Sequence, residues 1–336
     1  LRRDILELTL SEHPEATLTA NAYGDEIERL MHAMGIDESS FGQHSKKGEL
    51  DQSHPYMRFN RDRCITCRRC LNVCEQVQGQ FVYGIDERGG ATHLIFGPTE
   101  SFADSPCTAC GACVDVCPTD AITDRDRLNR ASGSTTTKTI CGYCGVGCQI
   151  EVSTSDQHVV KVGGVHDAAV NRGHLCVKGR YAHGWHHSSD RLTKPLRRKG
   201  KKLYEISWEE AIEFAVGELK RIRDQHGPDA LATSTSSRST NEAAYLLQKM
   251  FRTVIGTNNV DCCARICHAS TALGLRLATG AGAATASYDD IERAGCIVIA
   301  GANPTEAHPV VGARLKQAAL AGTPMIVIDP REIELA

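Results

Sequence analysis

Most of the 16 cysteines fall into three groups whose spacing could hold metal clusters. The first two groups share the spacing C-x2-C-x2-C-x3-C: Cys64, Cys67, Cys70 and Cys74, then Cys107, Cys110, Cys113 and Cys117, which Pro118 follows. Two such runs are typical of proteins that hold two 4Fe-4S clusters, and the fourth cysteine of each run then binds the other cluster. We therefore predict one cluster on Cys64, Cys67, Cys70 and Cys117, and a second on Cys107, Cys110, Cys113 and Cys74.

The third group combines a C-x2-C-x3-C run with one distant cysteine: Cys141, Cys144, Cys148 and Cys176. Glycines between these cysteines would let the backbone wrap closely around a cluster and turn its amides toward sulfur. Zinc is the alternative, and spacing alone leaves it open here. It fits the first two groups less well, because zinc usually takes two separated Cys-x-x-Cys pairs. We predict a third 4Fe-4S cluster.

A different chemistry is indicated by Cys267-His268, at the end of the run Cys-Cys-Ala-Arg-Ile-Cys-His. A thiolate can bind a soft metal through sulfur while the neighbouring imidazole handles a proton. We expect the other cysteines outside the three groups, Cys262, Cys263 and Cys296, to be small core residues.

The stretch from Asn258 to His268 resembles the metal-ligand segment of molybdenum- or tungsten-dependent formate dehydrogenases, and Leu175 to Tyr181 resembles the same family. The resemblance implies that Cys267 binds the metal, that His268 takes up the substrate proton, and that Lys178 lies between the Cys141 cluster and a pterin. It also implies that Ser237 and Arg238 approach the cofactor. That cofactor would be bis-molybdopterin guanine dinucleotide carrying molybdenum or tungsten. The family's substrate-binding arginine has no match in this chain.

The function implied by the resemblance is that of a formate dehydrogenase catalytic subunit, which oxidises formate to carbon dioxide and is reversible in principle. Electrons would leave through the clusters to an accepting subunit that carries flavin and NAD or further iron-sulfur clusters. Two alternatives stay open. One is another bis-pterin oxidoreductase such as a nitrate reductase, against which His268 argues. The other is a non-catalytic electron-transfer subunit, because the first 190 residues also resemble the large iron-sulfur subunit of NADH-quinone oxidoreductases.

Four domains are expected along the chain. Residues 1–50 have helical periodicity and resemble those large iron-sulfur subunits, but no cysteine stands near Thr17, Ala20 or Glu26, so we predict no cluster there and a structural role for His13. Residues 51–135 form a ferredoxin-like domain with a hairpin over 81–96, and 131–137 read as a linker. Residues 136–200 form a small 4Fe-4S domain with strands near 150–152 and 159–162. Residues 201–336 form an incomplete α/β pterin-binding domain.

The expected α/β domain begins with a helix capped by Ser207 and Glu210, followed by a second helix from a capping box at Ser239 to Gly256. A buried strand at 296–300, a helix over 308–321 and a strand at 325–328 predict a βαβ unit in a parallel sheet. Ligands bind beyond the carboxyl ends of such strands. We therefore assign the following residues to the cofactor: Gly301, Asn303, Glu306, His308, Asp329 and Arg331.

Composition narrows the function classes. A formal net charge of -3 gives no reason to expect nucleic acid as a partner. No apolar run approaches the roughly 20 residues that a membrane-spanning helix needs. Clustered cysteines without a secretory leader favour a reduced, cytosolic compartment over a disulfide-bonded secreted protein. The first residue is Leu1, and the last follows shortly after a predicted strand, so both ends look cut from a longer protein.

Overall fold

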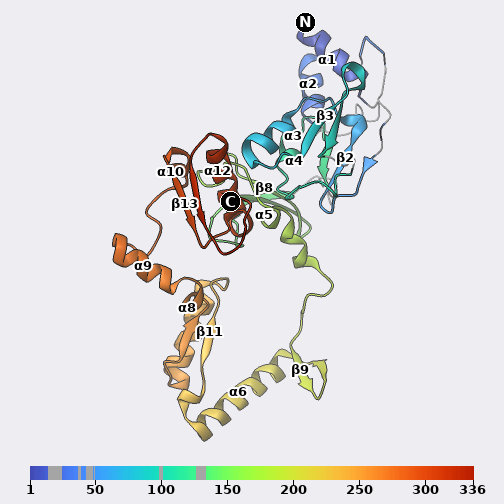
Figure 1. Ribbon diagram of the computed structural model, residues 1–336. Coiled ribbons are helices and arrows are strands. Elements are labelled where there is room, and N and C mark those ends of the chain that lie inside the picture. The colour runs from blue at the N-terminus through green and yellow to red at the C-terminus, as the bar shows by residue number, and fades with distance from the viewer. Residues whose placement is uncertain (14–24, 37–38, 43–47, 49, 98–100, 126–133) are drawn as a thin grey trace. The chain divides into compact units, whose positions relative to one another are not determined.

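The computed structural model describes residues 1–13, 25–36, 39–42, 48, 50–97, 101–125 and 134–336 (Figure 1). The described chain forms two compact units. The first unit combines Leu1–Trp185 with Tyr288–Ala336, and the second unit is His186–Ser287. Segments far apart in the sequence therefore share one unit, and all three cysteine groups lie in it. Thr17 and Ala20, where sequence analysis found no cluster ligand, lie outside the described residues.

The amino-terminal segment contributes two helices to the first unit, α1 (Arg2–Ser11) and α2 (Glu26–Met34). The Asp25 side chain caps α2 by accepting a 2.9 Å hydrogen bond from the Glu28 amide, and Gly35 ends the helix in the left-handed region. The two helices confirm the helical periodicity predicted for this segment; Ile27 and Met31 are buried, whereas Leu30 is 45% exposed. His13 is also buried.

The next module surrounds the first two cysteine groups and builds its core from a small sheet and a hairpin. Antiparallel pairing gives the sheet order β1-β2-β5 and joins β3 to β4, which confirms the predicted hairpin. An aromatic core of Phe59, Phe96 and Phe102 packs between them. The elements are β1 (Leu50–Asp51), β2 (Met57–Asn60), η2 (Arg61–Arg63), α3 (Arg69–Asn72), η3 (Val73–Gln78), β3 (Tyr83–Asp86), η4 (Gly89–Ala91), β4 (His93–Phe96), α4 (Ala112–Val116) and β5 (Ile122–Asp124).

The third cysteine group lies at one end of the antiparallel sheet β6-β7-β8, built from Thr135–Ile140, Gln149–Ser155 and His158–Gly164. This confirms the two strands predicted in this region. The linker expected at 131–137 is wrong for Thr135 to Thr137, because these residues pair with β7 as part of β6. Threonine is β-branched and fits a strand once a partner is available. Helix α5 (Val177–Tyr181) and η5 (Ala182–His187) follow the sheet.

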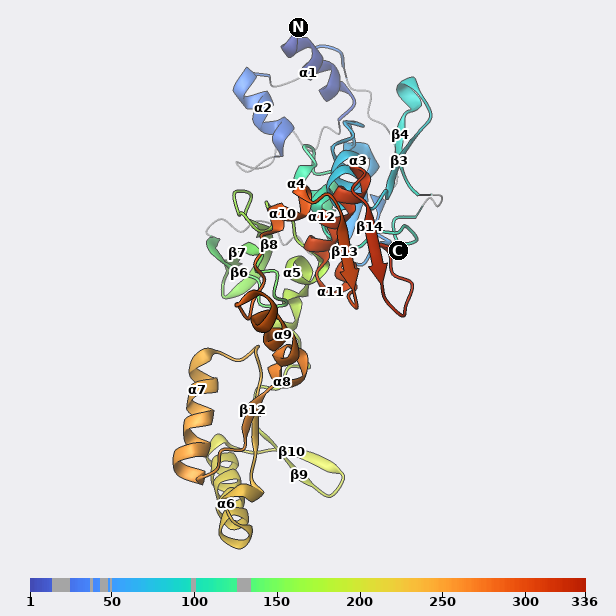
Figure 2. The ribbon, with the colours of Figure 1, turned by 60° about the vertical axis from the view of Figure 1, so that its left-hand side comes forward.

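The carboxyl-terminal segment returns to the first unit as a βαβ unit. Strands β13 (Ile297–Ala300) and β14 (Met325–Ile328) pair in parallel, with α11 (Pro304–Ala307) and α12 (Pro309–Leu320) between them and α10 (Tyr288–Arg293) ahead (Figure 2). The predicted parallel pair is confirmed. The larger parallel sheet is not present among the described residues, whose sheets have two or three strands and are mostly antiparallel. The predicted burial of the first strand is wrong for Val298, which is 60% exposed, because among the described residues β13 belongs to a sheet of two strands with little to cover it.

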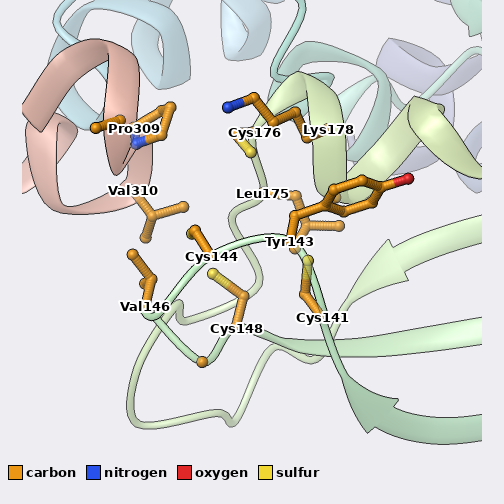
Figure 3. A pocket seen from close by; sticks show the side chains of 13 residues that line it. Cys141, Tyr143, Cys144, Val146, Cys148, Leu175, Cys176, Lys178, Pro309 and Val310 are labelled. Carbon is orange, nitrogen blue, oxygen red and sulfur yellow. The ribbon is translucent and has the colours of Figure 1, made fainter. Parts of the chain in front are cut away.

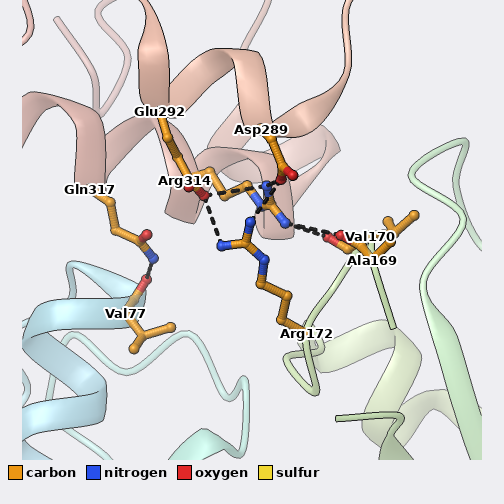
Figure 4. Close-up of polar contacts among 8 residues, drawn as sticks. All are labelled: Val77, Ala169, Val170, Arg172, Asp289, Glu292, Arg314 and Gln317. Atoms are coloured by element: carbon orange, nitrogen blue, oxygen red, sulfur yellow. Dashed lines mark hydrogen bonds and ion pairs between the residues drawn. The ribbon is translucent and has the colours of Figure 1, made fainter. Parts of the chain in front are cut away.

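Helix α12 holds this segment against both cysteine-bearing modules of the first unit (Figure 4). The buried Arg314 guanidinium donates to the carbonyls of Val170 (3.0 Å) and Ala169 (3.3 Å) and pairs with Asp289 at 2.8 Å. Three residues on, Gln317 donates to the Val77 carbonyl at 2.6 Å, at the end of η3. One helix therefore binds η3, which carries Cys74, and the loop between β8 and α5 that leads to Cys176.

The second unit contains a parallel pair as well, β11 (Thr233–Thr235) with β12 (Val260–Cys262). Ser207 and Glu210 form the predicted capping box, but the second helix begins one residue later than predicted, with Thr240 as its cap. Leu219 and Ile222 of α6 pack on the small core, whereas Ile212 of the predicted apolar face is 58% exposed. Its other elements are β9 (Leu196–Lys199), β10 (Lys202–Glu205), α6 (Trp208–His226), η6 (Pro228–Ala230), α7 (Asn241–Met250), η7 (Phe251–Ile255), α8 (Ala264–Cys267) and α9 (Ala269–Thr279).

Candidate functional site

In the ferredoxin-like module, the fourth cysteine of each run, Cys74 or Cys117, lies near cysteines of the other run. Burial raises the pKa of the Cys70 thiol to about 12, and charge on Cys64, Cys117 and Cys67 adds to this shift. Burial likewise raises the pKa of Cys74 to about 12, with further contributions from Cys110 and Cys107. Cys117 of the second run thus lies near Cys70 of the first, and Cys74 of the first run lies near Cys107 and Cys110 of the second. This proximity supports the crossed ligand sets predicted from spacing, which remain a prediction.

The backbone around the middle cysteine of each run has the same unusual conformation. Thr66 and Arg68 flank Cys67 with φ values of 50° and 63°, and Ala109 and Gly111 flank Cys110 with 55° and 73°. Left-handed backbone is costly for a β-branched residue such as threonine. Alternating left-handed residues turn successive amides to one side, which makes a concave site for an anion. The Ala109 amide already donates to the Cys107 sulfur at 3.3 Å, so the loop fits an anionic thiolate cluster.

The third group surrounds a recess in the first unit (Figure 3). Burial raises the pKa of Cys148 to about 12, and charge on Cys141, Cys144 and Cys176 contributes, so all four sulfurs are close. Pro309 and Val310 of α12 line the same recess, across from Cys141 in Figure 3. The recess is therefore lined both by the loops of the third cysteine group and by α12 of the βαβ unit.

A buried thiol with a raised pKa does not readily become a free thiolate, but its sulfur can bind a cationic metal centre that compensates the thiolate charge. Each bound iron would replace a proton and neutralise the thiolate charge that burial disfavours. Within the described ranges, no three histidine, cysteine, aspartate or glutamate side chains are arranged to hold a single metal ion.

Lys178 and Glu306, two of the residues assigned to the cofactor, line one cavity of about 230 Å³ in the first unit. Cys110 of the second predicted cluster and Cys176 of the third line it too, as does Lys316 of α12. Lys178 follows Cys176 by two residues at the start of α5, and both side chains line the recess drawn in Figure 3. The structure thus brings together a predicted cluster ligand, the predicted pterin lysine and an acidic residue from the βαβ unit.

Sequence analysis assigned no role to Arg180, which joins two of the cysteine modules. Its side chain is 1% exposed and makes a bidentate ion pair with Asp115, at 2.6 and 3.0 Å, and a longer contact with Asp124 at 3.4 Å. It lies against Gly111, where an added Cβ would come within 2.2 Å of the arginine Cδ. Arg180 lies four residues after Cys176, and its partners flank Cys117. Only the tertiary contacts identify it.

In the second unit, the predicted metal ligand lies just beyond the ends of parallel strands. Cys267 ends α8 and His268 joins α8 to α9, and both side chains are exposed. The Ser237 amide donates to the Cys263 sulfur at 3.2 Å, and hydrogen bonds from Ser237 lower the pKa of that thiol. Ser237 and the start of α8 therefore meet at the carboxyl edge of β11 and β12, where open α/β sheets bind ligands.

Two of the cysteines expected in the core are on the surface. Cys263 and Cys296 are exposed, and Cys262 is half-buried. Cys263 starts α8 at the strand edge, and Cys296 precedes the thinly covered strand β13, so neither position has a packed layer on both sides. The core assignment is therefore wrong for these two residues.

The remaining residues assigned to the cofactor follow β13 and β14 in the first unit. Gly301 extends the strand ladder by donating its amide to the Ile328 carbonyl at 2.8 Å. Asn303 precedes α11 and accepts from the Thr305 hydroxyl at 2.9 Å, and His308 precedes α12. Asp329 accepts from the Arg331 amide at 2.9 Å. These residues lie on one strand edge, and Arg238 lies with Cys267 in the second unit. Their contact with a cofactor remains a prediction.

Comparison with protein families accounts for most of this architecture. Residues 191–335 match the family described as molybdopterin oxidoreductase, and residues 134–187 match the molybdopterin oxidoreductase Fe4S4 domain. Together these matches cover more than half of the chain. The chain belongs to the molybdopterin oxidoreductases. Residues 63–121 match a 4Fe-4S dicluster domain, so the chain carries a ferredoxin-like module ahead of its Fe4S4 domain.

Curated relatives extend the comparison over the whole chain. A Staphylococcus haemolyticus protein named "Putative formate dehydrogenase" is 35% identical, and the alignment covers 100% of this chain and 38% of the relative. A protein of the same name from Staphylococcus aureus strain USA300 is 34% identical with the same coverage. This molybdopterin oxidoreductase chain therefore spans about two fifths of the length of the curated relatives it matches.

Solved structures show weaker likenesses. An NAD+-reducing [NiFe]-hydrogenase shares 26% identity at a TM-score of 0.34, over 40% of this chain and 56% of that one. Acetylene hydratase from Pelobacter acetylenicus shares 23% identity at a TM-score of 0.48, over 59% of this chain and 28% of that one. In the part of the chain that the structure describes, no helix has the length and apolarity to cross a membrane.

Proposed function

We propose that the chain is the amino-terminal part of a formate dehydrogenase catalytic subunit, which oxidises formate to carbon dioxide and can run in reverse. The observation that carries the proposal is the Cys267-His268 pair at the carboxyl edge of β11 and β12, in a chain that also brings three cysteine sets together. The names of the 34–35% identical relatives support formate as the substrate.

The family and the cysteine geometry support a particular cofactor set. We propose three 4Fe-4S clusters and a bis-molybdopterin guanine dinucleotide with molybdenum or tungsten. When bound, this cofactor would supply the redox chemistry for the two-electron oxidation of formate. Cys267 would hold the metal through its thiolate, and His268 would take up the proton released from formate.

The first unit would conduct the electrons. Lys178 lines a cavity together with Cys176 of the third cysteine group and Glu306, which supports its predicted place between the Cys141 cluster and the pterin. A nearby positive charge stabilises an added electron. From there the electrons would cross the ferredoxin-like module to an accepting subunit with flavin and NAD or further iron-sulfur clusters. The domain limits at 50, 135 and 200 and the cytosolic location are part of this proposal.

Metal content and a matched pair of variants test the proposal. We expect about twelve iron atoms and one molybdenum or tungsten per chain in the protein isolated without air, and formate-dependent reduction of a dye. Cys267→Ala should abolish formate oxidation and keep the iron, whereas Cys263→Ala, four residues earlier and also exposed, should keep both.

Each alternative has its own outcome. Iron without molybdenum or tungsten would favour the non-catalytic iron-sulfur subunit, and a full metal complement that turns over nitrate but not formate would favour another bis-pterin oxidoreductase. Stoichiometric zinc with little iron would refute the cluster assignment. Normal formate turnover in Cys267→Ala would refute the role of this cysteine.

A further inference from the structure

The hydroxyl of Tyr83 is a buried polar group without a completed hydrogen bond. Tyr83 lies in β3 and is 6% exposed, and among the described residues its oxygen has no hydrogen-bond partner. Burying a hydroxyl without a partner is unfavourable, because water satisfied it in the unfolded chain. Buried polar groups without a hydrogen-bond partner are few in native proteins, and each has a structural or functional explanation.

The surroundings of Tyr83 contain few polar groups. Its ring packs against Phe96, with centroids 5.7 Å apart, and Phe102, at 6.1 Å, in the core that also holds Cys113 and Cys74. The hydroxyl interacts with the Cys113 thiol, which is itself 5% exposed, and Cys70 and Cys107 also act on it. Tyr83 therefore lies beside predicted cluster ligands in an aromatic core.

Ligation would change what the Cys113 sulfur can do. As a thiol, Cys113 lies 3.8 Å from the Met57 sulfur and can donate its S–H to it. A sulfur bound to iron has lost that proton and can only accept. The Tyr83 O–H could then donate a hydrogen bond to the Cys113 sulfur, which would supply the acceptor that the hydroxyl lacks.

We propose that Tyr83 is a positioning residue for the cluster assigned to Cys74, Cys107, Cys110 and Cys113, donating an O–H···S hydrogen bond to the Cys113 thiolate that raises the reduction potential of this cluster. This inference rests on the iron-sulfur part of the proposed function. A hydrogen bond to sulfur strengthens as the cluster gains negative charge, so it favours the reduced state.

The other predicted cluster gives a natural comparison. Cys70 is the counterpart of Cys113 in the first run, and the donor next to it is the backbone amide of Leu71 rather than a hydroxyl. Two clusters with the same cysteine spacing would therefore differ in potential. The cluster beside Tyr83, which also borders the cavity with Lys178, would be the easier of the two to reduce.

Tyr83→Phe tests the inference, because it removes one oxygen and keeps the ring. In a redox titration of the cluster-loaded protein followed by paramagnetic resonance, one cluster signal should need a more negative potential. We expect a roughly fivefold lower ratio of reduced to oxidised cluster at fixed potential, equal to about 40 mV at 59 mV per tenfold. The other clusters should titrate as in the wild type.

Two control variants isolate the hydroxyl. Tyr56→Phe removes a hydroxyl from a partly exposed ring that stacks on Tyr181, and it should leave every potential unchanged. Met57→Leu removes the sulfur beside Cys113 and should also leave every reduction potential unchanged. Electron-nuclear double resonance of the wild-type protein should show an exchangeable proton coupled to the cluster beside Tyr83. This proton signal should be missing from Tyr83→Phe.

The outcomes separate this inference from the proposed function. Full cluster signals in Tyr83→Phe without a shift, or loss of iron from Tyr83→Phe alone, would overturn the role of the hydroxyl and leave the clusters in place. Absence of 4Fe-4S signals from wild-type protein would instead overturn the cluster assignment itself.

Discussion

Replacing Arg180 by methionine should destabilise the first unit strongly, because it leaves two carboxylates without their buried cation. Arg180 is 1% exposed, and its partners Asp115 and Asp124 have side chains that are each 20% exposed. Breaking a buried ion pair by removing one partner costs about 3–5 kcal/mol. Methionine keeps most of the packing against Gly111, so the loss comes mainly from the charge.

The assay is urea unfolding of the cluster-loaded protein without air, followed by circular dichroism and by loss of the iron-sulfur absorbance. At a slope of about 1–3 kcal/mol per molar urea, the expected loss moves the midpoint of the first unit down by at least about 1 M. Adding Asp115→Asn should recover part of the loss, since it removes one uncompensated carboxylate.

The matched control is Arg221→Met in the second unit. Arg221 pairs with Glu218 at 2.8 Å, close to the 2.6 Å of Arg180 with Asp115, but its side chain is 50% exposed. Exposed pairs contribute about 0–1 kcal/mol, so this variant should unfold nearly as wild type does. The reasoning fails if both variants lose the same stability, or if Arg180→Met unfolds within about 1 kcal/mol of wild type.

Three further predictions concern single side chains. His268→Ala should lower formate turnover and flatten its pH dependence near neutrality, while dithionite still reduces the clusters; an unchanged pH profile would exclude the proton role. Lys178→Ala should slow cluster reduction by formate in rapid-freeze paramagnetic resonance and leave the iron content unchanged, so clusters that fill at the normal rate would make this lysine merely structural. Burial lowers the pKa of His54 below 6.5, where its Nδ1 accepts from the amides of Tyr56 and Met57, both at 3.2 Å. As the pH drops, the His54 imidazole is therefore protonated in the unfolded chain before it is protonated in the folded chain, and the free energy of unfolding should fall from pH 6.5 toward the folded pKa. Urea unfolding at several pH values should show that His54→Asn lacks the part of this pH dependence that His54 contributes.

The sequence alone determined the features whose physics is local. A C-x2-C-x2-C-x3-C run predicts a cluster loop because three sulfurs must reach one centre from one turn of chain. The hairpin of β3 and β4, the Ser207 capping box and the β13-α12-β14 unit depend on neighbouring residues, and all three are present. Family membership also followed from short motifs.

Only the tertiary structure decided which distant residues act together. Arg180, the Arg314 and Gln317 contacts of α12, and the buried hydroxyl of Tyr83 carry no local signal, because the residues that they meet lie 25 to 240 residues away in the sequence. Thr135 to Thr137 read as a linker until β7 supplied a pairing edge. Burial was the least predictable property: exposure of Cys263 and Val298 depends on which layers cover a strand, and a strand's own residues do not encode its neighbours.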